Sequence, residues 1–576
     1  MSSLQSLQSA VSLRGVANLL GFKARALAYI LYKKSPQAKY RSFEILKRRG
    51  GSRKIDAPSA DLMLLQRRLS DLLQDCVAEI NKAHNRKDDL AHGFKRDRSI
   101  ITNATKHRRR RYVLNIDLKD FFGTINFGRV RGFFLKDRNF ALHKDAATVL
   151  AQIACHENSL PQGSPCSPVI SNLIGNVLDI HLGKLAFDTG CIYSRYADDI
   201  TFSTNKPQFP PSLARPVEGE NHRWEVGEVL QEIVTRAGFG INAEKTRMQY
   251  RNSRQDVTGL VVNSKVNIRS EYRRTVRAMA HRLFITGKFE LTTTVRDALG
   301  TLIPAKKEGT LAQLHGMLGH IDRVDRHNLN LAQPHGRSRN WGISSKENLF
   351  RRFLAFKEFY SAPAPVVLCE GKTDNVYLRH AIESLASAYP SLATVSQQKA
   401  VTLNVRLFRY QDTSTGRILQ LNGGTGDFKN FIPYYVKLLA KFRAPGGQQP
   451  TVLLVDNDKA SRPIYSVASQ FAKQRPTGKE PFVHIAGNLY LIATPLKKRQ
   501  QESVIEDCFT KQTRNVRLSG KTFNPRKEGF NPAAHFGKHI FSEYIEKNAH
   551  NVDFRGFADI LTRLAAVIDA HKKATP

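Results

Sequence analysis

The sequence predicts a multidomain chain of mixed α+β and α/β class, with an antiparallel sheet first and a mostly parallel sheet after it. Three observations support this. The 576 residues are too many for a single hydrophobic core. Short strand-like runs flank two adjacent aspartates near residue 198, as in a hairpin. Beyond residue 363, nearly continuous apolar strands alternate with helical stretches, which is typical of a parallel sheet.

Loop signals and changes of pattern divide the chain into six stretches. We expect an N-terminal helical segment, an α+β domain, a basic helical region, a linker, an α/β domain and a C-terminal extension. Their expected bounds are 1–45, 46–268, 269–330, 331–362, 363–510 and 511–576.

The chain is strongly basic, with 89 Lys and Arg against 50 Asp and Glu, a formal net charge of +39. Residues 1–360 carry 59 basic and 33 acidic residues, and the rest carries 30 and 17, so the two parts have net charges of +26 and +13. Both parts are therefore expected to meet a polyanion, with nucleic acid the leading candidate. The alternative is a basic protein that is merely well solvated.

The six cysteines form no Cys-x-x-Cys pair and lie mostly in apolar runs, so we expect reduced core thiols. The N-terminus lacks the apolar core of a signal peptide, and no run approaches the roughly 20 apolar residues of a membrane span. These features predict a soluble, cytoplasmic protein without a membrane partner.

The first candidate site is the stretch Tyr-Ser-Arg-Tyr-Ala-Asp-Asp-Ile-Thr-Phe-Ser, in which Asp198 and Asp199 occupy the tip of a predicted hairpin. Another strand begins at Tyr112 and ends at Asp117. If the strands are neighbours in one antiparallel sheet, three carboxylates converge. Such a cluster suits the two divalent cations used for phosphodiester and nucleotidyl chemistry. The alternative is a polar hairpin tip with no chemical role.

Four other residues could serve a nucleotide at this site. Arg53, in a basic hairpin, could clamp a triphosphate or belong to ordinary surface. Gln162 lies in a Pro-Gln-Gly loop that can approach nucleotide and template closely. Phe122 could exclude a ribose 2′-hydroxyl beside the incoming sugar, or be a core residue. Lys245 is placed to protonate a leaving pyrophosphate.

Residues 40 to about 330 resemble a reverse transcriptase. The motifs occur in that family's order: a strand ending in Asp117, Pro-Gln-Gly, Tyr-Ala-Asp-Asp, Gly-Phe-Gly-x-Asn-x-x-Lys-Thr and Val-Thr-Gly. The resemblance implies a right-hand polymerase with fingers, an antiparallel-sheet palm and a helical thumb. It implies deoxynucleoside triphosphates as substrates and two Mg²⁺ ions, for which Mn²⁺ can substitute. The implied metal positions are Asp117, Leu118, Asp198 and Asp199.

Within that family, the Asn-Ala-x-x-His pattern from Asn103 to His107 and the Val-Thr-Gly run at 257–259 resemble bacterial retron enzymes. Retron enzymes copy part of their own structured non-coding RNA, starting from an internal guanosine 2′-hydroxyl, and leave a branched RNA–DNA hybrid (msDNA). The rival is an intron or diversity-generating reverse transcriptase, which needs maturase or accessory-protein regions. The basic stretch 269–321, expected to be helical, resembles a thumb that grips the RNA. The expected RNA-binding residues are Asn103, His107, Arg269, Arg273, Arg274 and Arg277.

A second set of acids follows two apolar strands farther along. Glu370 comes after the strand that begins at Val366, and Asp456 and Asp458 come after the strand that begins at Thr451. Carboxyl ends of parallel strands share one edge of a sheet, so these acids should form a second divalent-metal cluster. The alternative is solvated acids in turns.

Residues 363 to about 510 resemble a toprim domain, the Rossmann-like module of topoisomerases, primases and overcoming-lysogenization-defect nucleases. Glu370, Asp374, Asp456 and Asp458 match its Glu-Gly-x-x-Asp and Asp-x-Asp motifs. Glu506 or Asp507 would add a metal ligand, and Lys538 would neutralise charge in the transition state, or be a plain surface lysine. The chain leaves no room for a topoisomerase tyrosine domain, which favours a nuclease.

Together these features predict a retron reverse transcriptase fused to a toprim nuclease effector. The resemblance implies a role in anti-phage defence, in which the RNA–DNA product restrains the toxic effector. The nuclease target would be DNA or RNA, tRNA included, and a homo-oligomer is left open. The rival interpretation is a non-catalytic toprim module for binding or oligomerisation.

Overall fold

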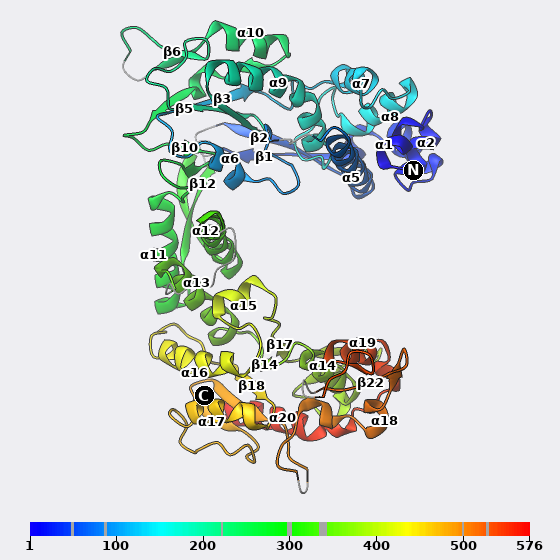
Figure 1. The fold of residues 1–576 in the computed structure, drawn as a ribbon, viewed down its shortest axis with the longest axis vertical. Coiled ribbons are helices and arrows are strands. Elements are labelled where there is room, and N and C mark those ends of the chain that lie inside the picture. The colour runs from blue at the N-terminus through cyan, green and yellow to red at the C-terminus, as the bar shows by residue number, and fades with distance from the viewer. Residues whose placement is uncertain are drawn as a thin grey trace. The chain divides into compact units, whose positions relative to one another are not determined.

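The computed structural model describes residues 1–47, 51–85, 89–220, 223–296, 302–332, 343–497, 500–525 and 529–575 (Figure 1). The chain forms two compact units. The first unit comprises residues 1–273, 292–305 and 323–337. The second unit comprises residues 274–291, 306–322 and 338–576. The expected domain boundaries stay a prediction, although this division assigns two parts of the expected thumb to the second unit.

An antiparallel sheet lies at the centre of the first unit, with the strand order β4-β5-β3-β8 and with β9 also paired to β3. Residue 117 on β3 lies opposite residue 199 on β5. The predicted hairpin is confirmed, with its tip at residues 197–198 between β4 and β5. The strands are β3 (Tyr112–Lys119), β4 (Ile192–Tyr196), β5 (Asp199–Thr204), β8 (Gly240–Ile241) and β9 (Arg247–Tyr250).

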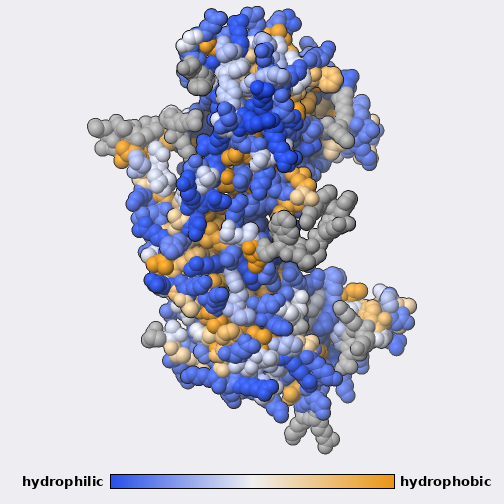
Figure 2. Space-filling model, turned by 60° about the vertical axis from the view of Figure 1, so that its left-hand side comes forward, coloured by the Kyte–Doolittle hydropathy of each residue, from blue (hydrophilic) through white to orange (hydrophobic). Residues whose placement is uncertain are grey.

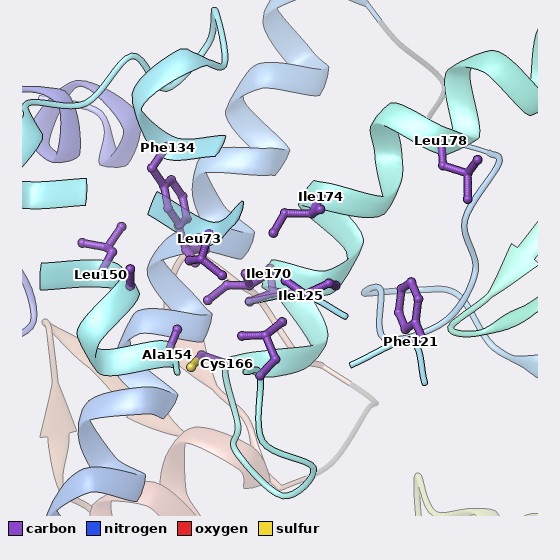
Figure 3. Packing of buried hydrophobic residues seen from close by; sticks show 14 of the residues in the cluster. Leu73, Phe121, Ile125, Phe134, Leu150, Ala154, Cys166, Ile170, Ile174 and Leu178 are labelled. Atoms are coloured by element: carbon purple, nitrogen blue, oxygen red, sulfur yellow. The ribbon is translucent and has the colours of Figure 1, made fainter. Parts of the chain in front are cut away.

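Four helices bury apolar side chains in one core with this sheet. Figure 3 shows Leu73, Phe134, Leu150 and Ile170, from four different helices, in this core. Each of the four side chains is fully buried. The helices are α5 (Ala60–Ala83), α7 (Phe127–Lys136), α8 (Lys144–Ala154) and α9 (Ser167–Thr189).

The chain begins with short helices, as predicted, and continues into an antiparallel hairpin of β1 and β2. Residues 48–50, between these two strands, lie outside the described residues. The Val-Thr-Gly run begins at the end of one strand and forms the turn of a small hairpin. These elements are α1 (Ser3–Gln8), α2 (Leu13–Leu19), α3 (Ala24–Ala28), α4 (Pro36–Lys39), β1 (Tyr40–Leu46), β2 (Ser52–Pro58), α6 (Ile100–Lys106), β10 (Asp256–Val257) and β11 (Leu260–Val261).

The prediction of continuous helix over 269–321 is wrong. Two strands, β12 (Glu290–Arg296) and β13 (Leu302–Glu308), pair with each other between helices α11 (Ser270–Thr286) and α12 (Leu311–Ala332). The run Thr-Thr-Thr-Val at 292–295 explains the strand, because β-branched side chains lose less freedom in a strand than in a helix.

The second unit contains a five-stranded sheet in the order β17-β14-β18-β20-β19. All pairings are parallel except that of the edge strand β19, so the predicted mostly parallel sheet is confirmed. Helices α14 and α20 pack on one face of the sheet, and aromatic residues of the segment 356–360 pack against α16. The elements are β14 (Val366–Cys369), α14 (Asp374–Ser384), β17 (Arg406–Leu407), α16 (Thr425–Leu439), β18 (Thr451–Val455), β19 (Val483–Ala486), β20 (Leu489–Ala493), α19 (Lys538–Lys547) and α20 (Ala558–Ala574).

The C-terminal part of α11 packs within the second unit. The Phe284 ring contacts the rings of Phe356 and Phe442, with centroids 5.6 and 5.5 Å away. The backbone N–H of Arg443 donates to the Phe284 carbonyl at 2.9 Å. Helix α13 (Ser345–Ala355), within the expected linker, continues into residues 356–360.

Hydrophilic side chains cover much of the face seen in Figure 2. All six cysteines are free, and four of them are buried. No helix in the described part of the chain combines the length and apolar composition that a membrane span requires.

Candidate active sites

The first acidic site, Asp117, Asp198 and Asp199, forms where β3 meets the tip of the β4–β5 hairpin. The backbone N–H of Leu118 donates to the Asp198 carbonyl at 2.9 Å, which ties the strand to the tip. Ala197 holds the tip with φ +57°, a left-handed conformation that few non-glycine residues adopt. The structure therefore brings together the three aspartates that the sequence analysis singled out.

The three carboxylates repel one another. Burial, together with the charges of Asp198 and Asp117, raises the pKa of Asp199 to about 6. Burial and Asp117 also raise the pKa of Asp198. The Lys245 ammonium donates to Asp117 Oδ1 at 2.7 Å, and the Asn242 amide donates to the same oxygen at 3.3 Å. Lys245 is thus an ion-pair partner of the site, and its expected role toward pyrophosphate stays a proposal.

A buried ion pair behind the hairpin holds the acidic site in place. Arg195 is fully buried and makes two hydrogen bonds of 2.7 Å to the Asp179 carboxylate. Arg195 also donates to the Ala197 carbonyl at 3.0 Å, and the Tyr193 hydroxyl donates to Asp179 at 2.6 Å. Sequence reasoning missed this network, because the residues around Asp179 give no local sign of a charged partner.

Replacing Arg195 with Ala is expected to lower the free energy of unfolding of the first unit by about 3–5 kcal/mol, because Asp179 would keep a buried charge without a partner. Urea-induced unfolding measures this loss. As a control, Arg236→Ala removes an exposed arginine that pairs with Glu232 within α10 (Glu228–Arg236). The control should change stability by less than about 1 kcal/mol. Equal losses in the two variants would contradict the prediction.

Asn103 and His107 are fully buried behind the hairpin and have no surface with which to touch RNA. The His107 ring bonds the Ser203 and Ser194 hydroxyls, each at 2.7 Å, and the Ser194 hydroxyl donates to Asn103 at 2.6 Å. Burial lowers the pKa of His107 to about 3, so the ring is neutral. This corrects the expectation of direct RNA contact: the two residues join α6 to strands β4 and β5.

The other three residues expected around the nucleotide lie on one strand and two loops of the first unit. Arg53 is exposed on β2, and its charge lowers the pKa of Asp198, opposing the effect of burial. The Gln162 carbonyl accepts from the Asp56 N–H at 2.8 Å. A Cβ on Gly163 would come within 2.6 Å of the Asp56 carbonyl, so glycine is needed there. Phe122 is half-buried, and its ring lies 6.3 Å from that of Phe94.

The four arginines expected in the thumb differ in their surroundings. Arg269 pairs with the buried Asp256 at 3.0 Å, so it has a structural partner. Arg273, Arg274 and Arg277 lie on α11 and are exposed. The three exposed residues keep their expected RNA-binding role as a proposal.

The second acidic site, Glu370, Asp374, Asp456, Asp458 and Glu506, forms at the carboxyl end of the parallel sheet. The Glu370 N–H donates to the Leu454 carbonyl at 3.2 Å, which brings the ends of β14 and β18 together. Asp374 accepts from the Gly371 N–H at 2.8 Å, and Asp456 accepts from the Ile505 N–H at 2.9 Å.

Glu506 and Lys538 complete the second acidic site. Glu506 is 1 % exposed, and the Lys538 ammonium lies 3.0 Å from one of its oxygens and 3.1 Å from the other. Asp507, the alternative ligand, instead pairs with Arg514 at 2.7 Å. Asp458 accepts from the Ser461 N–H at 3.1 Å.

Mutual repulsion also marks the second site. Burial, then the charges of Asp374 and Asp458, raises the pKa of Glu370 to about 7. Burial raises the pKa of Asp374, Asp456 and Glu506 as well. One buried oxygen of Glu370, Oε2, has no hydrogen-bond partner in the structure. An unpartnered carboxylate oxygen among acids is a feature that a cation would relieve.

The donors of both sites suit a hard divalent cation, since Mg²⁺ prefers carboxylate oxygens. At the second site the unpartnered Glu370 oxygen supports the fit directly. Among the residues that the structure describes, no three His, Cys, Asp or Glu side chains already stand in a metal-holding arrangement.

The raised pKa of Glu370 predicts how stability changes with pH when metal is absent. Between the ordinary pKa of 4.5 and about 7, the folded chain holds a proton that the unfolded chain releases. This contribution is fully present below pH 4.5 and is lost as the pH rises through 7. In EDTA, the melting temperature of the Glu370→Gln variant minus that of the wild type should therefore increase as the pH is raised from 5 to 8. A constant difference across this range would contradict the prediction.

Sequence reasoning also missed two residues that support Glu370. The Tyr410 hydroxyl donates to the carbonyls of Cys369 and Glu370 at 2.6 and 3.2 Å, and the Gln411 amide donates to Glu370 at 3.1 Å. In the sequence, the two residues belong to a short polar stretch after the apolar pair Leu407-Phe408. Such a stretch gives no sign of a contact with Glu370, some forty residues earlier.

Comparison with known proteins matches residues 45–268 to the reverse transcriptase (RNA-dependent DNA polymerase) family. The retron Ec86 reverse transcriptase of Escherichia coli is 36% identical over 193 residues, covering 33% of this chain and 55% of that protein. The retron Mx65 reverse transcriptase of Myxococcus xanthus is 35% identical over 261 residues, covering 42% and 56%. The chain thus spans about half the length of these curated relatives.

Among solved structures, a telomerase from Candida albicans in complex with a fragment of telomeric RNA aligns with a TM-score of 0.30 and 9% identity. The alignment covers 55% of this chain and 63% of that one. A likeness at this level is too weak to support a shared fold.

Proposed function

We propose that this chain is a retron reverse transcriptase that copies its cognate non-coding RNA into msDNA, primed from a guanosine 2′-hydroxyl. One observation carries the proposal: Asp117, Asp198 and Asp199 converge within a region that matches the reverse transcriptase family. The similarity to retron enzymes supports the choice of template.

The chemistry follows from the arrangement of the chain's own groups. Two Mg²⁺ ions on the three aspartates would supply charge neutralisation for attack of a primer hydroxyl on a deoxynucleotide α-phosphate. Arg53 would bind the triphosphate by forked hydrogen bonds, and Lys245 would leave Asp117 to meet the departing pyrophosphate. Phe122 would exclude a ribose 2′-hydroxyl, and Gln162 would hold the nucleotide against the template.

Coexpression of the chain with the non-coding RNA gene expected just upstream tests this proposal. A single-stranded DNA that keeps a short RNA after ribonuclease treatment and loses it on debranching is the expected product. DNA made equally well from an unrelated RNA, or DNA without a 2′-linked RNA, would contradict the retron assignment. The second result would favour an intron or diversity-generating enzyme.

We further propose that the second unit is a toprim nuclease effector that acts in anti-phage defence and is restrained by the msDNA. Glu370, Asp374, Asp456 and Asp458 follow parallel strands as the toprim motif requires, and Lys538 beside Glu506 would neutralise charge in the transition state. The rival is a catalytically idle toprim module. Nicking of DNA or RNA that requires both a divalent cation and Glu370 would exclude the rival.

A further inference from the structure

We propose that a shallow groove along β17, in the second unit, binds a nucleotide unit, with its phosphate on Arg379 and Arg409 and its sugar or base on Asn375. The groove consists of two adjoining cavities of about 360 and 230 Å³. Arg406, Leu407 and Arg409 line both of them. We call this feature the arginine groove.

The arginine groove lies at the open edge of the sheet, where no further strand of this sheet pairs with the outward backbone N–H groups. Strand β17 is the edge strand beside β14. The N–H groups of Arg406 and Phe408 donate to Pro365 and Val367, on the β14 side. Because successive residues of a strand alternate in direction, the Leu407 N–H faces the groove. Such an outward N–H is a donor for a phosphate oxygen.

The charged side chains leave the groove net positive. Arg406 is neutralised, because it pairs with Glu358 at 2.5 Å. Arg409 is exposed, and no ion pair among the described residues involves it. Within the described part of the chain, the one ion-pair contact of Arg379 is a loose one, 3.9 Å from Glu383. Two arginines are thus available for an anion, and guanidinium groups match phosphate oxygens with paired donors.

Asn375 points to a ligand that carries a hydrogen-bond donor besides its anionic group. The residue is 6 % exposed, lines the smaller cavity, and its Oδ1 atom has no hydrogen-bond partner in the structure. A buried acceptor without a partner is costly, so a ligand donor is expected there. A sugar hydroxyl or a base amino group supplies such a donor, whereas an ionised phosphate does not.

Residues that line the arginine groove are neighbours in sequence of residues that form or support the second acidic site. Asn375 follows Asp374 on α14, and the segment that contains Arg409 continues into Tyr410 and Gln411, which bond the Glu370 carbonyl. If the groove holds the nucleic-acid strand that is cut, that role rests on the proposed nuclease function. The binding of a nucleotide in the groove is tested separately from cleavage.

The test uses the full chain in EDTA, so that cutting cannot occur. A 5′-phosphorylated tetranucleotide with one 5-iodouracil, as DNA and as RNA, is crosslinked by light, and the attachment site is mapped by mass spectrometry. We expect attachment within residues 403–411. The double variant Arg379→Gln/Arg409→Gln should raise the half-maximal probe concentration by about tenfold or more, because two charge-assisted contacts are lost. Arg475→Gln, which removes an exposed charge elsewhere in the unit, should change it by less than about twofold.

Crosslinks found only outside residues 403–411 would overturn the inference. Equal half-maximal probe concentrations for the double variant and the control would overturn it too. Competition decides the ligand class: a mononucleotide should displace the probe at a lower concentration than inorganic phosphate, and equal displacement would refute the role of Asn375. If the chain binds the probe in the groove but its Glu370→Ala variant keeps full toxicity, only the nuclease proposal is contradicted. Lost groove binding with an active nuclease would remove this inference alone.

Discussion

Asp198→Asn is expected to abolish cDNA synthesis, lowering the rate on the order of a thousandfold. The substitution keeps the volume of the side chain and the hydrogen bond from Arg195 to the Ala197 carbonyl, so the hairpin should remain intact. It removes the charge of Asp198, which together with burial and the charge of Asp117 raises the pKa of Asp199. The variant thus loses the charge that would hold the cations. Primer extension with purified chain and cognate RNA measures the effect.

Asp188→Asn is the matched control, since Asp188 is exposed near the end of α9, outside the acidic site. Its rate should stay within about twofold of the wild type. RNA affinity should be similar in both variants, because the change affects the reacting groups. Synthesis by the Asp198 variant at more than a tenth of the wild-type rate would reject the assignment of the first acidic site.

Glu370→Ala should leave cDNA synthesis unchanged while abolishing toxicity. Glu370 belongs to the second unit, and the aspartates assigned to synthesis belong to the first. Loss of the carboxylate removes a ligand with an unpartnered oxygen, so metal-dependent cutting should fall on the order of a hundredfold or more. Cell survival after induced activation and cDNA yield are measured in the same cultures.

Glu546→Ala, at an exposed position on α19, controls for removing a glutamate from this unit. It should remain toxic and make normal amounts of cDNA. Full toxicity of the Glu370 variant would remove the nuclease proposal and favour the idle-module rival. Loss of synthesis in the same variant would show that the second acidic site also serves the first.

The sequence predicted most of what forms the two acidic sites, because several of the acids lie at or near the ends of strands, and strands have clear local patterns. Asp117 and Asp198 follow apolar runs, as do Glu370 and Asp456. Their convergence needed one further assumption, that the strands are neighbours, and the observed pairing of β3 with β5 and of β14 with β18 satisfies it.

Contacts between residues distant in sequence could not be predicted. Asn103 and His107 form a polar motif with the pattern of a binding site, yet each is enclosed by serines of the hairpin. The sequence left Glu506 and Asp507 as equal candidates for a metal ligand, and the ion pair between Asp507 and Arg514 distinguishes them. In each case the partner lies on another element, so local pattern carries no information about it.

The alternation of the chain between its two units has a consequence for evolution and for protein engineering. Six consecutive segments belong in turn to the first and second unit, so the chain crosses between them five times. A second unit exchanged by recombination at a single joint near residue 340 would arrive without residues 274–291 and 306–322. The exchanged gene would therefore encode an incomplete hydrophobic interior around Phe284, and successful natural swaps should carry breakpoints upstream of residue 274.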